Sequence, residues 1–193
     1  MPVKRLLISL FLVIVCSCVV GQRIDFFKED LVFSIDSACF SVNGDYYFRN
    51  PSNSPLTVKV LFPVSRTAGY KTVDTIIVYD ISKPANPVKT EVKDSIASFM
   101  ISFLPFSEKC VKIYYKQHHD GSRAKYILLS TKMWQKPLNE ASYTLITGRN
   151  LIVSGLSITP DKIEDFSESK VYYWKRKHFM PDRDFVFEFT VKE

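Results

Sequence analysis

Alternation of apolar and polar side chains constrains this chain more than any other feature. The final segment places aromatic or branched side chains at every second position, namely Phe185, Phe187, Phe189 and Val191. Successive side chains of a strand point to opposite faces of a sheet, so this period of two indicates a half-buried strand. The same pattern recurs at 57–62, 98–103, 110–115 and 142–145. A chain patterned in this way folds into β-sheets.

The alternation changes phase within Leu31–Val42. Apolar residues occupy odd positions up to Ile35 and even positions from Ala38, so the change falls near Ser37. One extra residue in a β-bulge shifts a strand in this way, and we therefore predict a bulge there.

Turn-forming residues separate these segments at the spacing of an antiparallel β protein. They occur at Asn43-Gly44, which we expect to be a tight hairpin, and at 50–55, 83–87, 120–121 and 148–150. Only Thr159–Phe166 carries a helix signature, because Thr159 suits the cap and Pro160 the first helical position. The sequence predicts an all-β fold, an antiparallel β-sandwich of about ten to twelve strands with at most one short helix.

The first 21 residues have the three parts of a secretory signal peptide. Lys4 and Arg5 are followed by an apolar stretch over 6–15 and by small residues up to Gly21. The apolar stretch is shorter than the roughly 18 residues of a membrane-spanning helix. We expect cleavage after Gly21, a single domain over residues 22–193, and a protein that is periplasmic or extracellular. Residues 15–18 also resemble a bacterial lipobox, so the alternative is a lipoprotein anchored to the envelope membrane through Cys18.

The charge balance bears on the partners of such a protein. The chain has 26 Lys and Arg against 20 Asp and Glu, and loss of Lys4 and Arg5 would leave a net charge of +4. The basic residues are scattered apart from a run over 175–178, and neighbouring residues of a strand face opposite ways. We therefore expect no nucleic-acid partner.

Two cysteines, Cys39 and Cys110, lie beyond the signal peptide. Each one neighbours an apolar residue of its strand and so falls off the main apolar face. An even count in an oxidising compartment favours a disulfide between them. Two buried thiols are the alternative, and a redox pair would need a closer spacing.

His118-His119-Asp120 contains residue types that bind metals. Adjacent residues of a strand point to opposite faces, so the two histidines are poorly placed to share one ion. The following Gly121 makes this segment read as an exposed hairpin tip. We predict no metal site and no cofactor.

Asp182, Asp184 and Glu188 are the candidates for acid–base chemistry. Residues 181–184 read instead as a turn that enters the last strand, and no nucleophile or phosphate-binding motif accompanies them. The sequence therefore favours a protein without catalytic activity. The alternative is an enzyme, such as a hydrolase, whose site no motif reveals and which uses Asp182, Asp184 and a histidine such as His178.

Consecutive aromatic residues suggest where a partner could bind. The chain has 15 Phe, 10 Tyr and 2 Trp, most of which a β-sandwich would bury. In 46–48 and 172–174, however, three adjacent aromatic residues force at least one ring onto the outer face of a strand. We hypothesise that an outer face with Tyr46 or Tyr47 and with Tyr172 or Trp174 binds a protein, peptide or glycan. The alternative is that a second layer buries these rings as well.

Three segments, 43–63, 126–138 and 178–185, together resemble an exported bacterial domain family of unknown function. Their shared features are a strand that leads into a proline-closed turn, a Trp134–Pro137 corner, and a turn into the last strand. The resemblance implies a β-sandwich and brings no activity with it. Independently of it, we expect Trp134 to close one end of the sandwich.

Overall fold

The computed structural model describes residues 24–65, 73–119 and 122–192, in which thirteen strands and one short 3₁₀-helix form. The strands are β1 (Asp25–Ile35), β2 (Cys39–Arg49), β3 (Leu56–Pro63), β4 (Val73–Asp80), β5 (Thr90–Lys93), β6 (Ile96–Phe103), β7 (Glu108–His118), β8 (Arg123–Tyr126), β9 (Leu138–Gly148), β10 (Leu151–Leu156), β11 (Lys162–Asp165), β12 (Ser169–Phe179) and β13 (Phe185–Val191), and the helix is η1 (Leu129–Trp134). The all-β fold predicted from the alternation is confirmed, with more strands than expected. No helix within the described ranges is long and apolar enough to cross a membrane.

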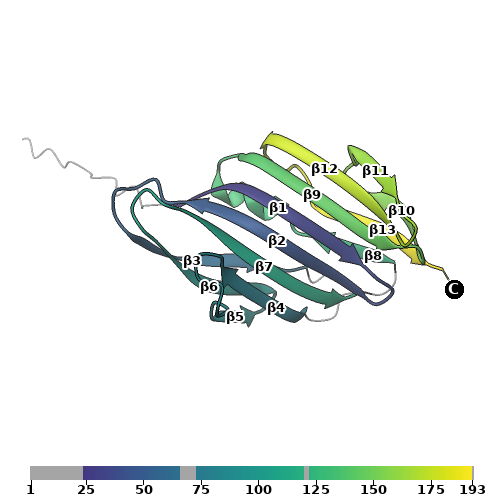
Figure 1. Cartoon of the computed structure of the whole chain (residues 1–193), viewed down its shortest axis with the longest axis horizontal. Coiled ribbons are helices and arrows are strands. Elements are labelled where there is room, and N and C mark those ends of the chain that lie inside the picture. The colour runs from purple at the N-terminus through teal and green to yellow at the C-terminus, as the bar shows by residue number, and fades with distance from the viewer. Residues whose placement is uncertain (1–23, 66–72, 120–121, 193) are drawn as a thin grey trace, which may run out of the picture.

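The strands form one large sheet and two small ones. The large sheet has seven strands in the order β11-β12-β9-β1-β2-β7-β4, and the small sheets have the orders β10-β13-β8 and β3-β6-β5. Figure 1 shows the long strands of the large sheet running diagonally across the molecule, with one small sheet near each end. The molecule is thus a two-layer sandwich whose second layer is divided.

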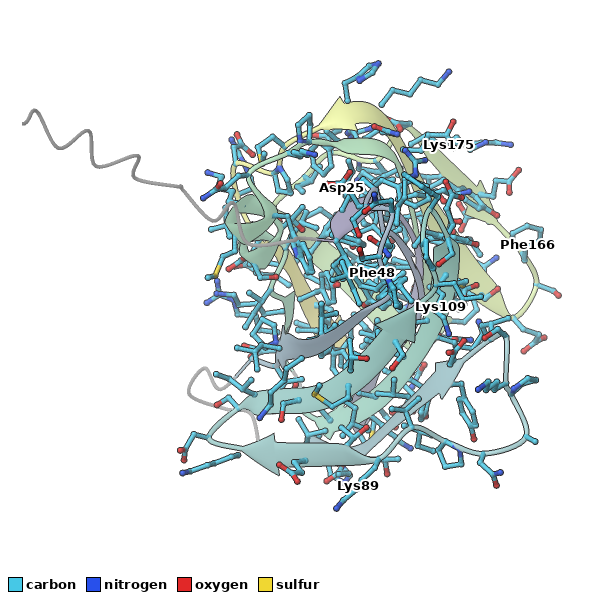
Figure 2. The ribbon with its side chains drawn as sticks, turned by 90° about the vertical axis from the view of Figure 1, so that its left-hand side faces the viewer. Asp25, Phe48, Lys89, Lys109, Phe166 and Lys175 are labelled. Carbon is cyan, nitrogen blue, oxygen red and sulfur yellow. The ribbon has the colours of Figure 1, made fainter. Side chains whose placement is uncertain are left out.

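Aromatic side chains join the layers. Phe33 of β1 packs on Phe185 and Phe187 of β13, with ring centroids 5.5 and 5.3 Å apart. Phe62 of β3 packs on Tyr46 and Tyr115 of the large sheet at 5.7 and 5.8 Å. Figure 2 shows side chains packed densely around Phe48, with Lys89 at the bottom and Lys175 near the top of the view. Both halves of the second layer therefore share the inner face of one sheet.

The large sheet is mixed, which corrects the prediction of a purely antiparallel fold. β1 pairs with β9 in parallel, with Lys28 opposite Glu140 and Ile35 opposite Thr147. A parallel pair needs a long connection, and here it is the whole chain between the two strands. Alternation within a strand carries no information about the direction of its neighbour.

The phase change near Ser37 is a hairpin and not a bulge. β1 ends at Ile35 and β2 begins at Cys39, and the Asp36 carboxylate accepts hydrogen bonds from the backbone N–H groups of Ala38 and Cys39. This Asx-type turn reverses the chain and resets the alternation. The bulge of β1 lies near Phe27 instead, where its register with β2 shifts.

Two further local predictions are corrected. Asn43-Gly44 lies inside β2, where Gly44 faces Leu31 so closely that a Cβ atom would come within 2.6 Å of the leucine side chain. Gly44 therefore serves close packing and not a turn. Residues 162–165 form β11, and the short helix is η1, which brings Trp134 to 5.7 Å from Phe26 and 5.6 Å from Phe48.

The predicted disulfide between Cys39 and Cys110 is wrong. Both cysteines lie on the outer face, as expected, but Cys39 pairs with His118 whereas Cys110 pairs with Tyr47, eight positions further along β2. Eight residues of a strand span ~27 Å, and a disulfide needs Cα atoms within about 7 Å. Both thiols are free.

Candidate functional site

The outer face of the large sheet carries the clearest candidate site. Sheet register places side chains from five strands in one row, in the order Cys110, Tyr47, Lys28, Glu140 and Lys177. Neighbouring strands lie about 4.8 Å apart, so this row crosses ~19 Å of the surface. Among the described residues no other layer covers this face, because both small sheets pack on the opposite one.

An open depression of about 500 Å³ lies at the end of this row. Its lining consists of Phe27, Lys28, Asn139, Glu140, Lys177 and His178. The residues come from β1, β9 and β12, which are neighbours in the sheet although they are far apart in the sequence. We call this set the outer-face depression.

Backbone irregularities shape the outer-face depression. Phe27 is the extra residue where the register of β1 and β2 shifts. A bulge changes the direction in which side chains point. Here it places the Phe27 ring on the outer face of β1, while the preceding residue, Phe26, is buried. His178 has φ of 47°, in the left-handed region that non-glycine residues rarely adopt. Such strain is concentrated at functional sites.

The cations around the outer-face depression differ in how they are neutralised. Lys28 lies 3.2 Å from Asp30 and 3.9 Å from Glu140, and its ammonium group sits over the Tyr47 ring at 4.9 Å. Arg49 stacks over Phe27 at 4.6 Å. Lys177 is exposed and forms no ion pair within the described ranges. An anionic group in the depression would therefore meet a cation whose charge is not already compensated.

Tyr47 is the one residue of the four hypothesised aromatic ligands that lies on this face. It is half-buried, and burial raises the pKa of its hydroxyl to about 12, with the Cys110 thiol beside it adding to the shift. The hydroxyl therefore stays protonated over the physiological range, and the ring carries no charge.

The other three aromatic residues are in the core, which corrects the predicted exposed patch. Tyr46, Tyr172 and Trp174 are 4, 5 and 0 % exposed. The Trp174 ring packs edge-on against Phe185, and its indole N–H donates to the Ile158 carbonyl. In each aromatic triplet the second layer thus buries the first ring. Trp174 also lies on the inner face, because residues two positions apart on a strand, here Tyr172 and Trp174, share a face.

Two of the three candidate carboxylates, Asp182 and Asp184, have structural partners. Asp184 pairs with Lys125 at 2.8 Å and accepts the Leu129 N–H at 2.9 Å, which ties β13 to β8 and η1. Asp182 pairs with its neighbour Arg183 on the surface, and Glu188 follows on the exposed side of β13. His178 lies with Glu140 in the outer-face depression and not with these carboxylates.

The two adjacent histidines point in different directions. His119 packs edge-on against Phe189 at 4.9 Å, and its Nε2 contacts the Asp36 carbonyl. His118 lies instead between Cys39 and Asp74, with Nδ1 3.3 Å from the thiol Sγ and Nε2 3.4 Å from a carboxylate oxygen. Sequence reasoning missed this cluster, because only the register of β2, β7 and β4 brings its members together.

Comparison with solved structures relates the fold to two groups of proteins. A putative nutrient binding protein from Legionella pneumophila superposes with a TM-score of 0.68 at 17 % identity, over 86 % of this chain and 67 % of that one. An M1 zinc metallopeptidase from Deinococcus radiodurans superposes with a TM-score of 0.51 at 9 % identity, over 86 % of this chain. This chain spans 42 % of the metallopeptidase. At such identities the likeness establishes the fold alone.

No family model and no curated protein matches the chain. The resemblance to an exported domain family stays a prediction.

Proposed function

We propose that this chain is a binding module of the cell envelope that holds a ligand carrying a carboxylate, such as an acidic peptide, in the outer-face depression. The observation that carries the proposal is the uncompensated Lys177 beside the strained His178 and the Phe27 ring. An aromatic face offers apolar contact, and a lysine ammonium offers a charge-assisted hydrogen bond to a carboxylate.

The likeness to the putative nutrient binding protein from Legionella is compatible with a binding role. The shape of the site supports it, because the depression is open and its groups converge on no nucleophile. The rival proposal is an enzyme that uses His178 and Glu140 for acid–base chemistry. A pH-dependent activity lost in Glu140→Gln would favour that rival.

Binding of short peptides tests the proposal. We expect peptides that end in Asp or Glu with a free carboxylate to bind more tightly than their amidated neutral counterparts. Lys177→Ala should weaken binding about tenfold, the scale of one lost charge-assisted contact. Isothermal titration calorimetry at low and high salt would measure it.

Lys175→Ala is the matched control. Lys175 lies two positions earlier on the same face of β12, is exposed, and does not line the depression. Equal weakening in both variants would mean that net charge alone attracts the peptides, and the proposed site would then be wrong. Selective binding of neutral glycans, without binding of the acidic peptides, would contradict a carboxylate ligand. It would favour a glycan, the other class of ligand that an aromatic ring suits.

We further propose that the protein is exported and cleaved after Gly21. The residues that carry this proposal, including Cys18, lie outside the described ranges. Intact-mass analysis of the protein expressed in bacteria tests it. A mass that matches residues 22–193 is the expected result, and a diacylglyceryl mass on a chain that begins at Cys18 would favour the lipoprotein.

A further inference from the structure

A second group of reactive side chains lies far from the outer-face depression, at the opposite end of the paired strands β2 and β7. It consists of Cys39, Asp74 and His118, whose ligand atoms all lie within 4.8 Å of one another. We call it the Cys39 cluster. From this geometry we propose that the Cys39 cluster binds a zinc ion, with the Cys39 thiolate, one His118 nitrogen and the Asp74 carboxylate as its three protein ligands.

The local structure brings each ligand to the cluster for a separate reason. Cys39 and His118 are register partners on β2 and β7, and the Asx-type turn at Asp36 fixes the start of β2. Asp74 is the extra residue where the register of β4 with β7 shifts between Val73 and Thr75. A bulge at a sheet edge re-aims a side chain, and here it turns Asp74 toward His118.

The donor set and the distances suit zinc. Thiolate, imidazole and carboxylate are its usual ligands, with bonds of about 2.0–2.3 Å, so donor atoms around one tetrahedral ion lie ~3.5 Å apart. The Cys39 Sγ and His118 Nδ1 atoms are 3.3 Å apart. The Asp74 oxygen now faces Nε2 at 3.4 Å, and rotation of this exposed carboxylate is the adjustment that the ion requires. Three protein ligands leave a fourth position for water.

Burial and the charges around Cys39 determine how much free energy is needed to deprotonate its thiol when zinc binds. Burial raises the pKa of the Cys39 thiol, which Lys116 nearby partly offsets and Asp36 and Asp74 reinforce. Zinc binds the thiolate, so the thiol proton passes to solvent as the S–Zn bond forms. The Lys116 ammonium also neighbours Cys39 and has to swing away from the ion, which its length allows.

Cobalt is the spectroscopic probe for this site. The experiment uses the full chain with Cys16→Ser and Cys18→Ser, so that no other cysteine than Cys39 and Cys110 competes. We expect Co²⁺ to give one thiolate-to-metal charge-transfer band that Zn²⁺ abolishes at one equivalent. The band should vanish in Cys39→Ser and persist in Cys110→Ser, the matched control with a free thiol on the same face.

Zinc affinity, measured by competition with a chromogenic chelator, tests the other two ligands. His118→Ala and Asp74→Asn should each weaken binding by about 100-fold, whereas His178→Ala should not change it. Absence of the cobalt band, or its loss in Cys110→Ser but not in Cys39→Ser, would overturn the proposal. If Cys39→Ser fails to fold, alkylation of the unsubstituted thiols decides: one equivalent of Zn²⁺ must protect Cys39 and not Cys110.

Discussion

At the residue scale, the least expected feature is a carboxyl group in the core. Glu29 is 1 % exposed, and its Oε1 accepts a hydrogen bond of 2.5 Å from the Tyr143 hydroxyl. Glu29 occupies an odd-numbered position like Leu31 and Phe33, so the period of two along this strand predicts that it faces the core. A single sequence gives no sign that Tyr143 of β9 would meet it, because the parallel pairing of β1 and β9 makes that contact.

Glu29 predicts how stability depends on pH. Burial raises its pKa from 4.5 to about 7, with Asp30 adding to the shift and the Tyr143 hydrogen bond opposing it. The folded chain therefore holds a proton that the unfolded chain releases, and stability falls as pH rises from about 4.5 to 7. At 1.36 kcal/mol per pKa unit the loss is about 3 kcal/mol. Urea unfolding of Glu29→Gln should lose this slope.

The exposed Glu91→Gln is the control for that experiment, and it should keep the slope of the unsubstituted chain. A Glu29→Gln variant that unfolds with an unchanged pH dependence between 4.5 and 7 would show that another group titrates there.

At the scale of elements, alternation predicted the strands whose two faces differ. The segments 57–62, 98–103, 110–115 and 142–145 all lie in strands, and β13 follows the final pattern closely. The short strands β5 and β11 have only four residues each, and their mostly exposed side chains give no period to detect. Turn signals were weaker evidence, because Asn43-Gly44 serves packing against Leu31 and not a hairpin.

The helix η1 gives a prediction for the corner at Trp134. Its ring packs on Phe26 and Phe48 at the ends of β1 and β2, so Trp134→Ala should remove a contact that closes one end of the core. We expect a loss of about 3 kcal/mol in the free energy of unfolding. Met133→Ala is the matched control, because Met133 is 83 % exposed on the same helix. Similar melting temperatures for the two variants would contradict the role of Trp134.

At the scale of the whole molecule, neither the order of the strands nor the outer-face depression could be predicted from the sequence. Phe27, Glu140 and Lys177 belong to strands that are adjacent only because β9 inserts between β1 and β12. The consecutive aromatic residues indicated that some rings lie on the outer face. They could not show that this ring is Tyr47, because the pattern treats it like the three rings that the second layer buries. Long-range order of strands is set by packing of the core, which a local pattern does not encode.

The same topology predicts that no disulfide between Cys39 and Cys110 contributes to the stability of the fold. β2 and β7 pair along their whole length, which holds Cys39 and Cys110 at opposite ends of one rigid ladder. A disulfide between them would contribute about 4 kcal/mol and raise the melting temperature by roughly 10 °C. We therefore expect the metal-free oxidised protein to melt at the same temperature with and without dithiothreitol. Cys110→Ser should behave likewise, since its thiol contributes a contact with Tyr47 and no crosslink. A fall of several degrees on reduction would require the two strands to separate and the register to be different from that described.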